Sequence, residues 1–268
     1  MRISLNASTI KPAPLLDKIR IAAETGYDGI ELWAVEIYEH IGRGGEVSEV
    51  ERALRDGALT VPCCIAVRGW GETKGREYEL VMEECRRRFE LAARLGSPLM
   101  VCTPPLEPVE MTRLAERYAA LLELGRQTGV RAVLEYISFF GSLQSLPEAA
   151  AILDACGDTE GSLVIDAFHS WNSLSTLEDL RALPVGRIAH YHIDDAAPNS
   201  PATSQRDPDR VMPGDGPIDL AGELRILKEK DYQGWVSLEL FNADLWQRDP
   251  RAVAKEGLDR VRRLIELS

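Results

Sequence analysis

The sequence predicts an α/β fold, a single (β/α)8 TIM barrel, with one domain covering residues 1–268. Two observations favour this fold class. Short β-type runs alternate eight times with longer helical patterns, and four ligand-type residues stand at the ends of the last four runs. A doubly wound open sheet has the same alternation, but it does not require ligand-type residues after four successive strands.

The predicted strands are short runs rich in apolar and β-branched residues, which suit the buried surface of a parallel sheet. In order, they cover Ile3–Ala7, Gly29–Trp33, Val61–Val67, Leu99–Thr103, Ala132–Ile137, Leu163–Ala167, Ala189–Ile193 and Val236–Leu240. In a barrel of parallel strands, the carboxyl ends of the strands meet at one face, where enzymes of this fold place their chemistry. Residues at these eight ends are therefore the first candidates for function.

The segments between the strands carry the apolar spacing of about 3.6 residues that is typical of helices with one buried face. The predicted helices cover Pro14–Thr25, Val47–Gly57, Arg76–Leu95, Pro108–Thr128, Pro147–Cys156, Thr176–Leu183, Leu220–Lys230 and Pro250–Leu267. Glycine follows many of them, for example Gly96 and Gly129, as helix C-terminal caps prefer. No GxGxxG or GxxxxGK[ST] loop follows the first strand, so dinucleotide or ATP binding has no support.

The composition excludes several classes of partner. A net charge of −12 repels phosphate backbones, so we expect no nucleic-acid partner. No run approaches the roughly 20 apolar residues that span a bilayer, and the first residues do not read as a signal peptide. The five cysteines include the adjacent pair Cys63 and Cys64 and match neither a disulfide framework nor a zinc cluster. We therefore expect a reduced, cytoplasmic setting without a membrane partner.

Three acids and one imidazole stand at the ends of four apolar runs, Arg131–Ile137, Ser162–Phe168, Ile188–Asp194 and Trp235–Phe241. These four residues are Glu135, Asp166, His192 and Glu239. The set suits one divalent cation such as Mn²⁺, Co²⁺ or Mg²⁺. Taken singly, a carboxylate at a strand end is often only a helix cap or a solvated loop residue. Four ligand-type residues on four successive strand ends together favour the metal site.

Two other histidines have different expectations. His190 shares the alternation of His192, so both imidazoles should lie on one side of their strand, with His190 deeper and structural. His40 falls in a predicted loop without an evident partner. The long stretch Asp195–Asp219 is predicted to be unstructured, and loops of this length are usually functional or mobile. Within it, Arg210 could fork onto a substrate oxygen, or it is an ordinary surface arginine.

Aromatic residues follow several strand ends, at Trp33, Trp70, Phe139, Phe140 and Trp171. Aromatic walls at a pocket mouth exclude water and pack against a sugar or cyclitol ring. We expect Trp33 and Trp70 to contact substrate in this way. The alternative reading is that these rings plug the barrel rim or form the interface of a homo-oligomer.

Taken together, these motifs resemble the xylose-isomerase-like TIM-barrel superfamily, which includes sugar isomerases and epimerases, inosose dehydratases, 3-dehydroshikimate dehydratases and apurinic endonucleases. The matching motifs are Gly26-Tyr-Asp-Gly-Ile-Glu31-Leu, Glu135, Asp166-Ala-Phe-His169, His192, Arg210-Val-Met-Pro-Gly-Asp-Gly216 and Glu239. The resemblance covers nearly the whole chain. It implies that Glu135, Asp166, His192 and Glu239 hold one divalent metal, and that His169 and Arg210 contact substrate.

Three positions bear on the choice among these relatives. The ketose 3-epimerases carry a further substrate-binding Glu where this chain has Gly141, which argues against a free ketohexose. Arg68 follows the third strand, where 3-dehydroshikimate dehydratases similarly place an arginine near the substrate carboxylate. The alternative for Arg68 is a salt bridge at the rim. However, bacterial dehydratases of that group often carry Gln at the position where this chain has His192, so this position differs from theirs.

The resemblance and the ligand set together predict an isomerase or epimerase of a small polyhydroxylated or carboxylated substrate. A proton leaves the carbon next to a carbonyl, and the metal stabilises the enediolate. Glu135 and Glu239 would act as base and acid on opposite faces of that carbon. With His169 as proton donor to a leaving hydroxyl, the same site would be a dehydratase of 3-dehydroshikimate or a keto-inositol. An apurinic-endonuclease-like nuclease and a non-catalytic binding barrel are more remote alternatives.

Overall fold

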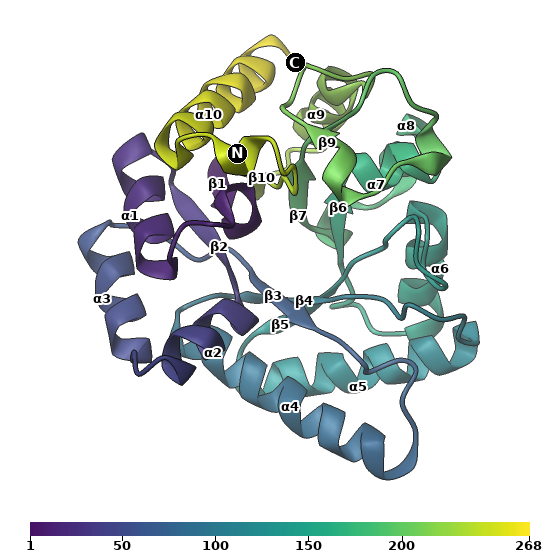
Figure 1. The fold of residues 1–268 in the computed structure, drawn as a ribbon. Coiled ribbons are helices and arrows are strands. Elements are labelled where there is room, and N and C mark those ends of the chain that lie inside the picture. Colours follow the sequence, from purple (N-terminus) through teal and green to yellow (C-terminus); the bar gives the residue numbers. More distant parts are fainter.

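The computed structural model describes residues 1–268 and shows eight parallel strands closed into a barrel (Figure 1). Around the barrel the order is β1-β10-β7-β6-β5-β4-β3-β2, and β1 closes the ring because it pairs with both β10 and β2. The strands are β1 (Arg2–Asn6), β2 (Gly29–Trp33), β3 (Cys64–Val67), β4 (Leu99–Cys102), β5 (Arg131–Leu134), β6 (Leu163–Asp166), β7 (Ile188–Ile193) and β10 (Trp235–Leu238). The predicted fold class is confirmed.

Helices surround the barrel on the outside, as Figure 1 shows. They are α1 (Leu15–Thr25), α2 (Ala34–Gly42), α3 (Val47–Asp56), α4 (Gly75–Arg94), α5 (Met111–Thr128), α6 (Leu146–Cys156), α7 (Ala167–Asn172), α8 (Leu177–Ala182), α9 (Leu220–Glu229) and α10 (Pro250–Leu267). All eight predicted helices are present, with ends that shift by up to three residues. None of the helices is both long enough and apolar enough to cross a membrane.

Two helices depart from the sequence-based expectations. Helix α2 was not predicted, and it contains His40, which was expected in a loop without a partner but lies 3.0 Å from Glu49. Helix α7 begins directly after β6, because the Asp166 side chain accepts a hydrogen bond from the backbone N–H of His169. No turn residues separate the strand from the helix, so the sequence pattern gave no boundary there.

The long stretch Asp195–Asp219 is more ordered than predicted. Its first two residues, β8 (Asp195–Ala196), form a short antiparallel pair with β9 (Arg210–Val211). The Asp195 carboxylate accepts hydrogen bonds from the backbone N–H groups of Gly214, Gly216 and Ile218, at 2.9 to 3.1 Å. These bonds hold the returning segment against the barrel mouth, and the strand pairing places Arg210 over the site.

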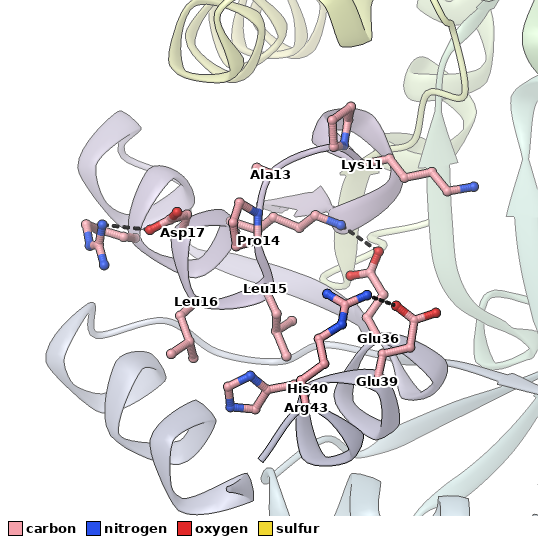
Figure 2. A pocket seen from close by; sticks show the side chains of 13 residues that line it. Lys11, Ala13, Pro14, Leu15, Leu16, Asp17, Glu36, Glu39, His40 and Arg43 are labelled. Atoms are coloured by element: carbon pink, nitrogen blue, oxygen red, sulfur yellow. Dashed lines mark hydrogen bonds and ion pairs between the residues drawn. The ribbon is translucent and has the colours of Figure 1, made fainter. Parts of the chain in front are cut away.

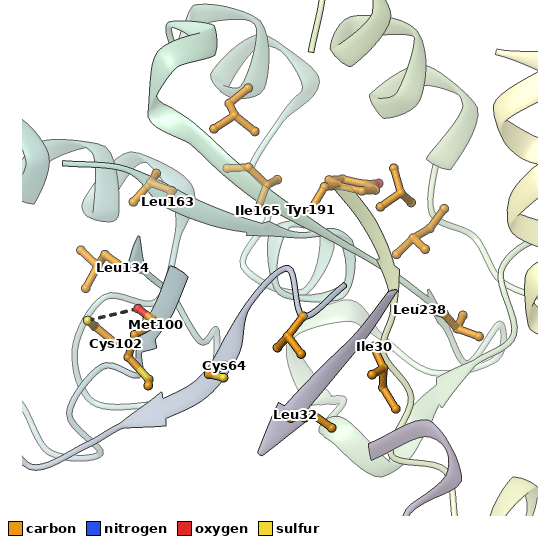
Figure 3. Close-up of a cluster of buried hydrophobic side chains, with 14 of the residues drawn as sticks. Ile30, Leu32, Cys64, Met100, Cys102, Leu134, Leu163, Ile165, Tyr191 and Leu238 are labelled. Atoms are coloured by element: carbon orange, nitrogen blue, oxygen red, sulfur yellow. Dashed lines mark hydrogen bonds between the residues drawn. The ribbon is translucent and has the colours of Figure 1, made fainter. Parts of the chain in front are cut away.

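Two apolar regions lie on the two sides of the strands. The larger fills the space between the barrel and the helices, and Figure 3 shows part of it, including Ile30, Leu32, Tyr191 and Leu238. A smaller cluster fills the barrel interior and consists of Cys63, Ile65, Ala66, Leu99, Val101, Val133, Val164 and Ala189. These residues come mainly from β3 to β6. On β1, β2, β7 and β10, the positions between the outward apolar residues are buried polar side chains, namely Ser4, Asn6, Glu31, His190, His192 and Ser237.

Candidate metal centre

The four predicted metal ligands meet at one end of the barrel. Asp166 ends β6, His192 lies in β7, and Glu135 and Glu239 directly follow β5 and β10. One ligand atom from each residue lies within 4.8 Å of the others, and all four residues are buried. We call this set the outer cluster. The parallel strand ends bring together residues that are up to about a hundred positions apart in the chain.

The Nδ1 atom of His192 faces the three acids of the outer cluster. It lies 3.1 Å from Glu239, 3.6 Å from Asp166 and 3.8 Å from Glu135, yet it is buried without a hydrogen-bond partner. A buried nitrogen without a partner is costly unless something else satisfies it. Three carboxylates and one imidazole form a donor set for a divalent cation, which would supply that partner. The residues therefore fit a metal ion.

The other side of the His192 ring belongs to a second set, which we call the inner cluster. Glu31 on β2 contacts Nε2 of His190 at 2.9 Å through one oxygen and Nε2 of His192 at 3.1 Å through the other. The three side chains are fully buried. Although burial opposes the charge of Glu31, the two imidazoles hold its pKa well below the usual range. As expected from the alternation, His190 and His192 point to the same side of β7.

Arg210 lies fully buried among the acids rather than on the surface. Its Nη1 donates to Asp166 at 2.8 Å, to Glu239 at 3.2 Å and to Asp194, and its Nη2 donates to Asp207 at 2.9 Å. Although burial favours neutral Asp166, Arg210 and His169 hold the pKa of that acid well below its usual range. The guanidinium therefore offsets part of the negative charge of the outer cluster and orients two of its carboxylates.

Asp194, which the sequence analysis did not select, is a further buried acid beside this arginine. One of its oxygens accepts the backbone N–H of Phe168 at 2.9 Å, at the start of α7. Burial, together with the neighbouring charge of Asp166, raises the pKa of Asp194 well above its usual range. Asp194 therefore joins the end of β7, the start of α7 and Arg210.

His169 lies beside the outer cluster with both ring nitrogens engaged. Its Nε2 is 3.0 Å from Nη2 of Arg210, and its Nδ1 is 3.2 Å from the Ser138 hydroxyl. Because the guanidinium can only donate, Nε2 must accept and Nδ1 carries the proton. Burial lowers the pKa of His169, even though Asp166 favours the charged form. The ring is therefore a neutral imidazole at neutral pH.

Glu135 and Glu239 differ in how firmly the protein holds them. Glu239 accepts hydrogen bonds from Asn6 at 2.8 Å and from Arg210 at 3.2 Å. The nearest charged partner of Glu135 is Nδ1 of His192 at 3.8 Å. Burial, and next the charge of Glu239, raise the pKa of Glu135 to about 8. Among the three acids of the outer cluster, Glu135 is thus the one that the surrounding side chains hold least firmly.

A cavity of about 460 Å³ opens beside the outer cluster. Its lining includes Trp33, Arg68, Asp207 and Phe241. Trp33 packs edge-on against Phe241 and donates its indole N–H to Asn6, whose amide in turn holds Glu239. One wall of the cavity is therefore linked to Glu239 through direct side-chain hydrogen bonds.

The charges around this cavity are unevenly paired. The acids Glu36, Glu39 and Asp207 are paired with Lys18, Arg43 and Arg210, respectively. Arg68 lies in the cavity wall without an acidic partner, so the salt bridge considered for it is not formed. A substrate that enters the cavity therefore meets an uncompensated positive charge.

Trp70 lies away from this cavity. It is fully buried, and its indole N–H donates to the backbone carbonyl of Thr103 at 2.8 Å. A larger cavity of about 640 Å³ lies between α1 and α2, and Figure 2 shows part of its lining, with Leu15 and Leu16 on α1 and Glu36 and Glu39 on α2. It adjoins the first cavity because both are lined by Lys11, Glu36 and Glu39. None of the four ligands lines either cavity.

The site also contains residues that the sequence reasoning missed. Glu31 was noted only as part of a motif, and neither Asn6 nor Asp194 was selected. Each of them stands at or near a strand end, which was the available signal. Their partners are 26 to 233 residues away in the chain, so their roles depend on the closed barrel.

The model of one protein family, described as xylose isomerase-like TIM barrel, matches residues 19–264. The chain belongs to this family. It is 26% identical over 267 residues to an inosose isomerase of Halalkalibacterium halodurans, an alignment that covers 97% of this chain and 94% of the relative. It is 25% identical over 257 residues to a 3-dehydroshikimate dehydratase of Pseudomonas aeruginosa, covering 91% of this chain but 39% of that longer protein.

The fold has a close counterpart among solved structures. The crystal structure of the IOLI protein with a zinc atom superposes with a TM-score of 0.92 and 21% identity, covering 99% of this chain and 98% of that one. The relatives are thus named as enzymes of more than one reaction type, an isomerase and a dehydratase. Family membership alone does not choose between them.

Proposed function

We propose that the protein is a divalent-metal-dependent isomerase or epimerase of a sugar-like hydroxy-ketone. The observation that carries this proposal is the outer cluster, in which three buried carboxylates surround the unpartnered Nδ1 of His192. Glu135, Asp166, His192 and Glu239 would hold one cation, of which Mn²⁺, Co²⁺ and Mg²⁺ suit the donor set. When bound, such a cation supplies the Lewis acidity that polarises a substrate carbonyl.

Two acids would carry the proton. Glu135 and Glu239 follow β5 and β10, and β6 and β7 lie between these strands, so the two carboxylates reach the site from different sides. Glu135 would remove the proton next to the carbonyl, because the protein holds it less firmly than Glu239: its nearest charged partner is Nδ1 of His192, 3.8 Å away. Glu239 would return the proton from the opposite side, giving an epimer or, at the neighbouring carbon, an isomer.

Other residues would bind and orient the substrate. His169 is neutral and lies beside the outer cluster, and the guanidinium of Arg210 lies among the ligands. Trp33 offers an aromatic wall to a ring, and Arg68 offers its unpaired charge to a carboxylate or a polarised oxygen of the substrate. Trp70 is enclosed by protein, and we assign it a packing role in this proposal.

The comparisons support an isomerase and suggest a cyclic substrate. The inosose isomerase matches over almost the full length of both chains, and the related IOLI structure holds a zinc atom. The second candidate is dehydration of 3-dehydroshikimate or a keto-inositol. Arg68 favours it, because that unpaired cation faces the cavity where a substrate carboxylate would lie, and a named 3-dehydroshikimate dehydratase is among the relatives.

An assay in deuterated water separates the two candidates. The purified protein, loaded with Mn²⁺, is incubated with a keto-inositol and, separately, with 3-dehydroshikimate. Proton NMR follows deuterium uptake next to the carbonyl, and ultraviolet absorbance follows any unsaturated product. An isomerase gives an isomer that carries deuterium and no absorbing product. An absorbing product without any isomer would select the dehydratase, and no turnover of any hydroxy-ketone would leave a binding protein.

A further inference from the structure

Glu31 is a buried acid of the barrel interior that contacts His192 at Nε2, on the side of the ring away from the other three metal-ligand candidates. It lies on β2, whereas His190 and His192 lie on β7, and β1 and β10 separate these strands in the barrel. The Glu31 side chain therefore reaches across the interior to make both of its contacts. The two imidazoles meet at 85°, with ring centres 5.2 Å apart, and the carboxylate bonds to the same nitrogen, Nε2, of each ring.

The chemistry of a carboxylate fixes the direction of these hydrogen bonds. An ionised carboxylate only accepts, so both Nε2 atoms must carry a proton and donate it. In a neutral imidazole with a proton on Nε2, the lone pair is on Nδ1. For His192 that atom is the one that faces Glu135, Asp166 and Glu239. Glu31 thereby determines which nitrogen of His192 is offered to the outer cluster.

We propose that Glu31 is a positioning residue for the metal centre, which fixes the tautomer and ring orientation of His192 so that Nδ1 becomes the ligand atom. The inference rests on the proposed metal site, and it adds a role for a residue outside the set of four ligands. Removing the hydrogen-bond acceptor behind a ligating histidine typically weakens metal affinity about 10- to 100-fold.

His190 provides the matched control, because it is the other partner of the same carboxylate. Replacing Glu31 with Gln leaves one carbonyl acceptor and adds an amide donor, so the side chain can no longer accept from both rings. Replacing His190 with Gln leaves the contact between Glu31 and His192 in place. Both substitutions disturb a buried hydrogen bond, so a purely structural role predicts similar losses for the two variants.

The test is zinc binding by titration calorimetry for the wild type, Glu31→Gln and His190→Gln, at a temperature where melting curves show each variant folded. We expect zinc affinity to fall at least about tenfold in Glu31→Gln and to stay within about threefold of the wild type in His190→Gln. Equal affinity of the wild type and Glu31→Gln would overturn the inference and leave the metal site standing. Absence of zinc binding by the wild type would overturn both.

A second measurement needs no variant at Glu31 and decides the matter if Glu31→Gln does not fold. Nitrogen NMR of the zinc-loaded wild type, labelled with ¹⁵N at histidine and assigned with the help of His190→Gln, distinguishes the two ring nitrogens. We expect His192 to retain its proton on Nε2 and to bind zinc through Nδ1. A His192 that binds zinc through Nε2, or that lacks a proton there, would overturn the role of Glu31.

Discussion

The outer and inner clusters use the same histidine ring in opposite ways. In the inner cluster, each oxygen of Glu31 contacts an imidazole Nε2, and Nδ1 of His190 has no carboxylate around it and no hydrogen-bond partner. In the outer cluster, Nδ1 of His192 has no hydrogen-bond partner although three acids surround it. The hydrogen bonds to Glu31 orient the two rings, whereas an unpartnered nitrogen among three carboxylates retains the capacity to bind a cation. The difference teaches that one strand, β7, supplies both the support of the site and its reactive edge.

The largest effect on turnover is expected from a substitution in the outer cluster. In Glu239→Gln, one charged ligand and one proton carrier are lost, while the amide oxygen can still accept the hydrogen bond from Asn6. We expect turnover to fall by about 10²- to 10⁴-fold with little change in melting temperature. Steady-state kinetics and circular dichroism check this. The exposed acid Glu266 on α10 provides the control, Glu266→Gln. Near-normal turnover in Glu239→Gln would remove Glu239 from the mechanism.

A smaller effect is expected at the mouth of the site. Arg68→Gln removes one of two unpaired cations from the cavity wall, leaving Lys11, and it does not alter the outer cluster. If this charge binds the substrate, kcat/KM should fall about tenfold or more, mostly through KM, because a hydrogen bond from a charged group contributes roughly 1.5–3 kcal/mol. The control is Arg76→Gln, in an exposed pair with Glu79. Unchanged kinetics would place Arg68 outside the substrate site.

Metal binding to the outer cluster should also depend on pH, because two of its residues carry protons that a cation must displace. Burial raises the pKa of Glu135 to about 8, and the neighbouring acids Glu239 and Glu31 raise that of His192 despite its burial. A cation needs both groups deprotonated, so binding releases protons and metal affinity rises with pH up to about 8. For each group that must lose its proton, the metal affinity should rise by about tenfold per pH unit. Calorimetry in buffers of different ionisation enthalpy measures this release, and an affinity independent of pH would contradict it.

The smallest effect concerns stability, at a buried acid outside both clusters. Burial raises the pKa of Glu223 on α9 to about 7, although the hydroxyl of Tyr191 donates to it. Because its folded-state pKa is raised, wild-type stability should decline as pH rises from about 4.5 to about 7. Glu223→Gln should remove this decline. The difference in unfolding free energy between Glu223→Gln and the wild type should therefore be on the order of 1–3 kcal/mol more favourable to the variant at pH 8 than at pH 4.5.

Urea denaturation of wild type and Glu223→Gln at pH 4.5 and pH 8 gives the comparison. Glu229→Gln serves as control, since Glu229 is an exposed acid on the same helix. Equal pH dependence in the wild type and Glu223→Gln would mean that Glu223 remains ionised in the folded state. That result would weaken the view that burial sets the charge of acids in this barrel.

The sequence predicted what depends on local pattern. Alternating β and α segments revealed the barrel, and the strand-end rule selected four residues that the structure brings together. The contacts across the barrel could not be predicted, because Glu31 and His192 are 161 residues apart and no local pattern joins them. Similarly, α7 was missed because it begins directly after the last residue of β6, without a turn. Arg210 was selected, but its complete burial depends on the pairing of β8 with β9.

The central claim is that the outer cluster holds one divalent cation through Nδ1 of His192. The most direct test is a crystal of the protein soaked with Mn²⁺ and measured for anomalous scattering. The account predicts one strong peak, coordinated by Glu135, Asp166, Glu239 and the Nδ1 atom of His192. A peak elsewhere, a peak coordinated by Nε2, or no peak at a saturating Mn²⁺ concentration would contradict it.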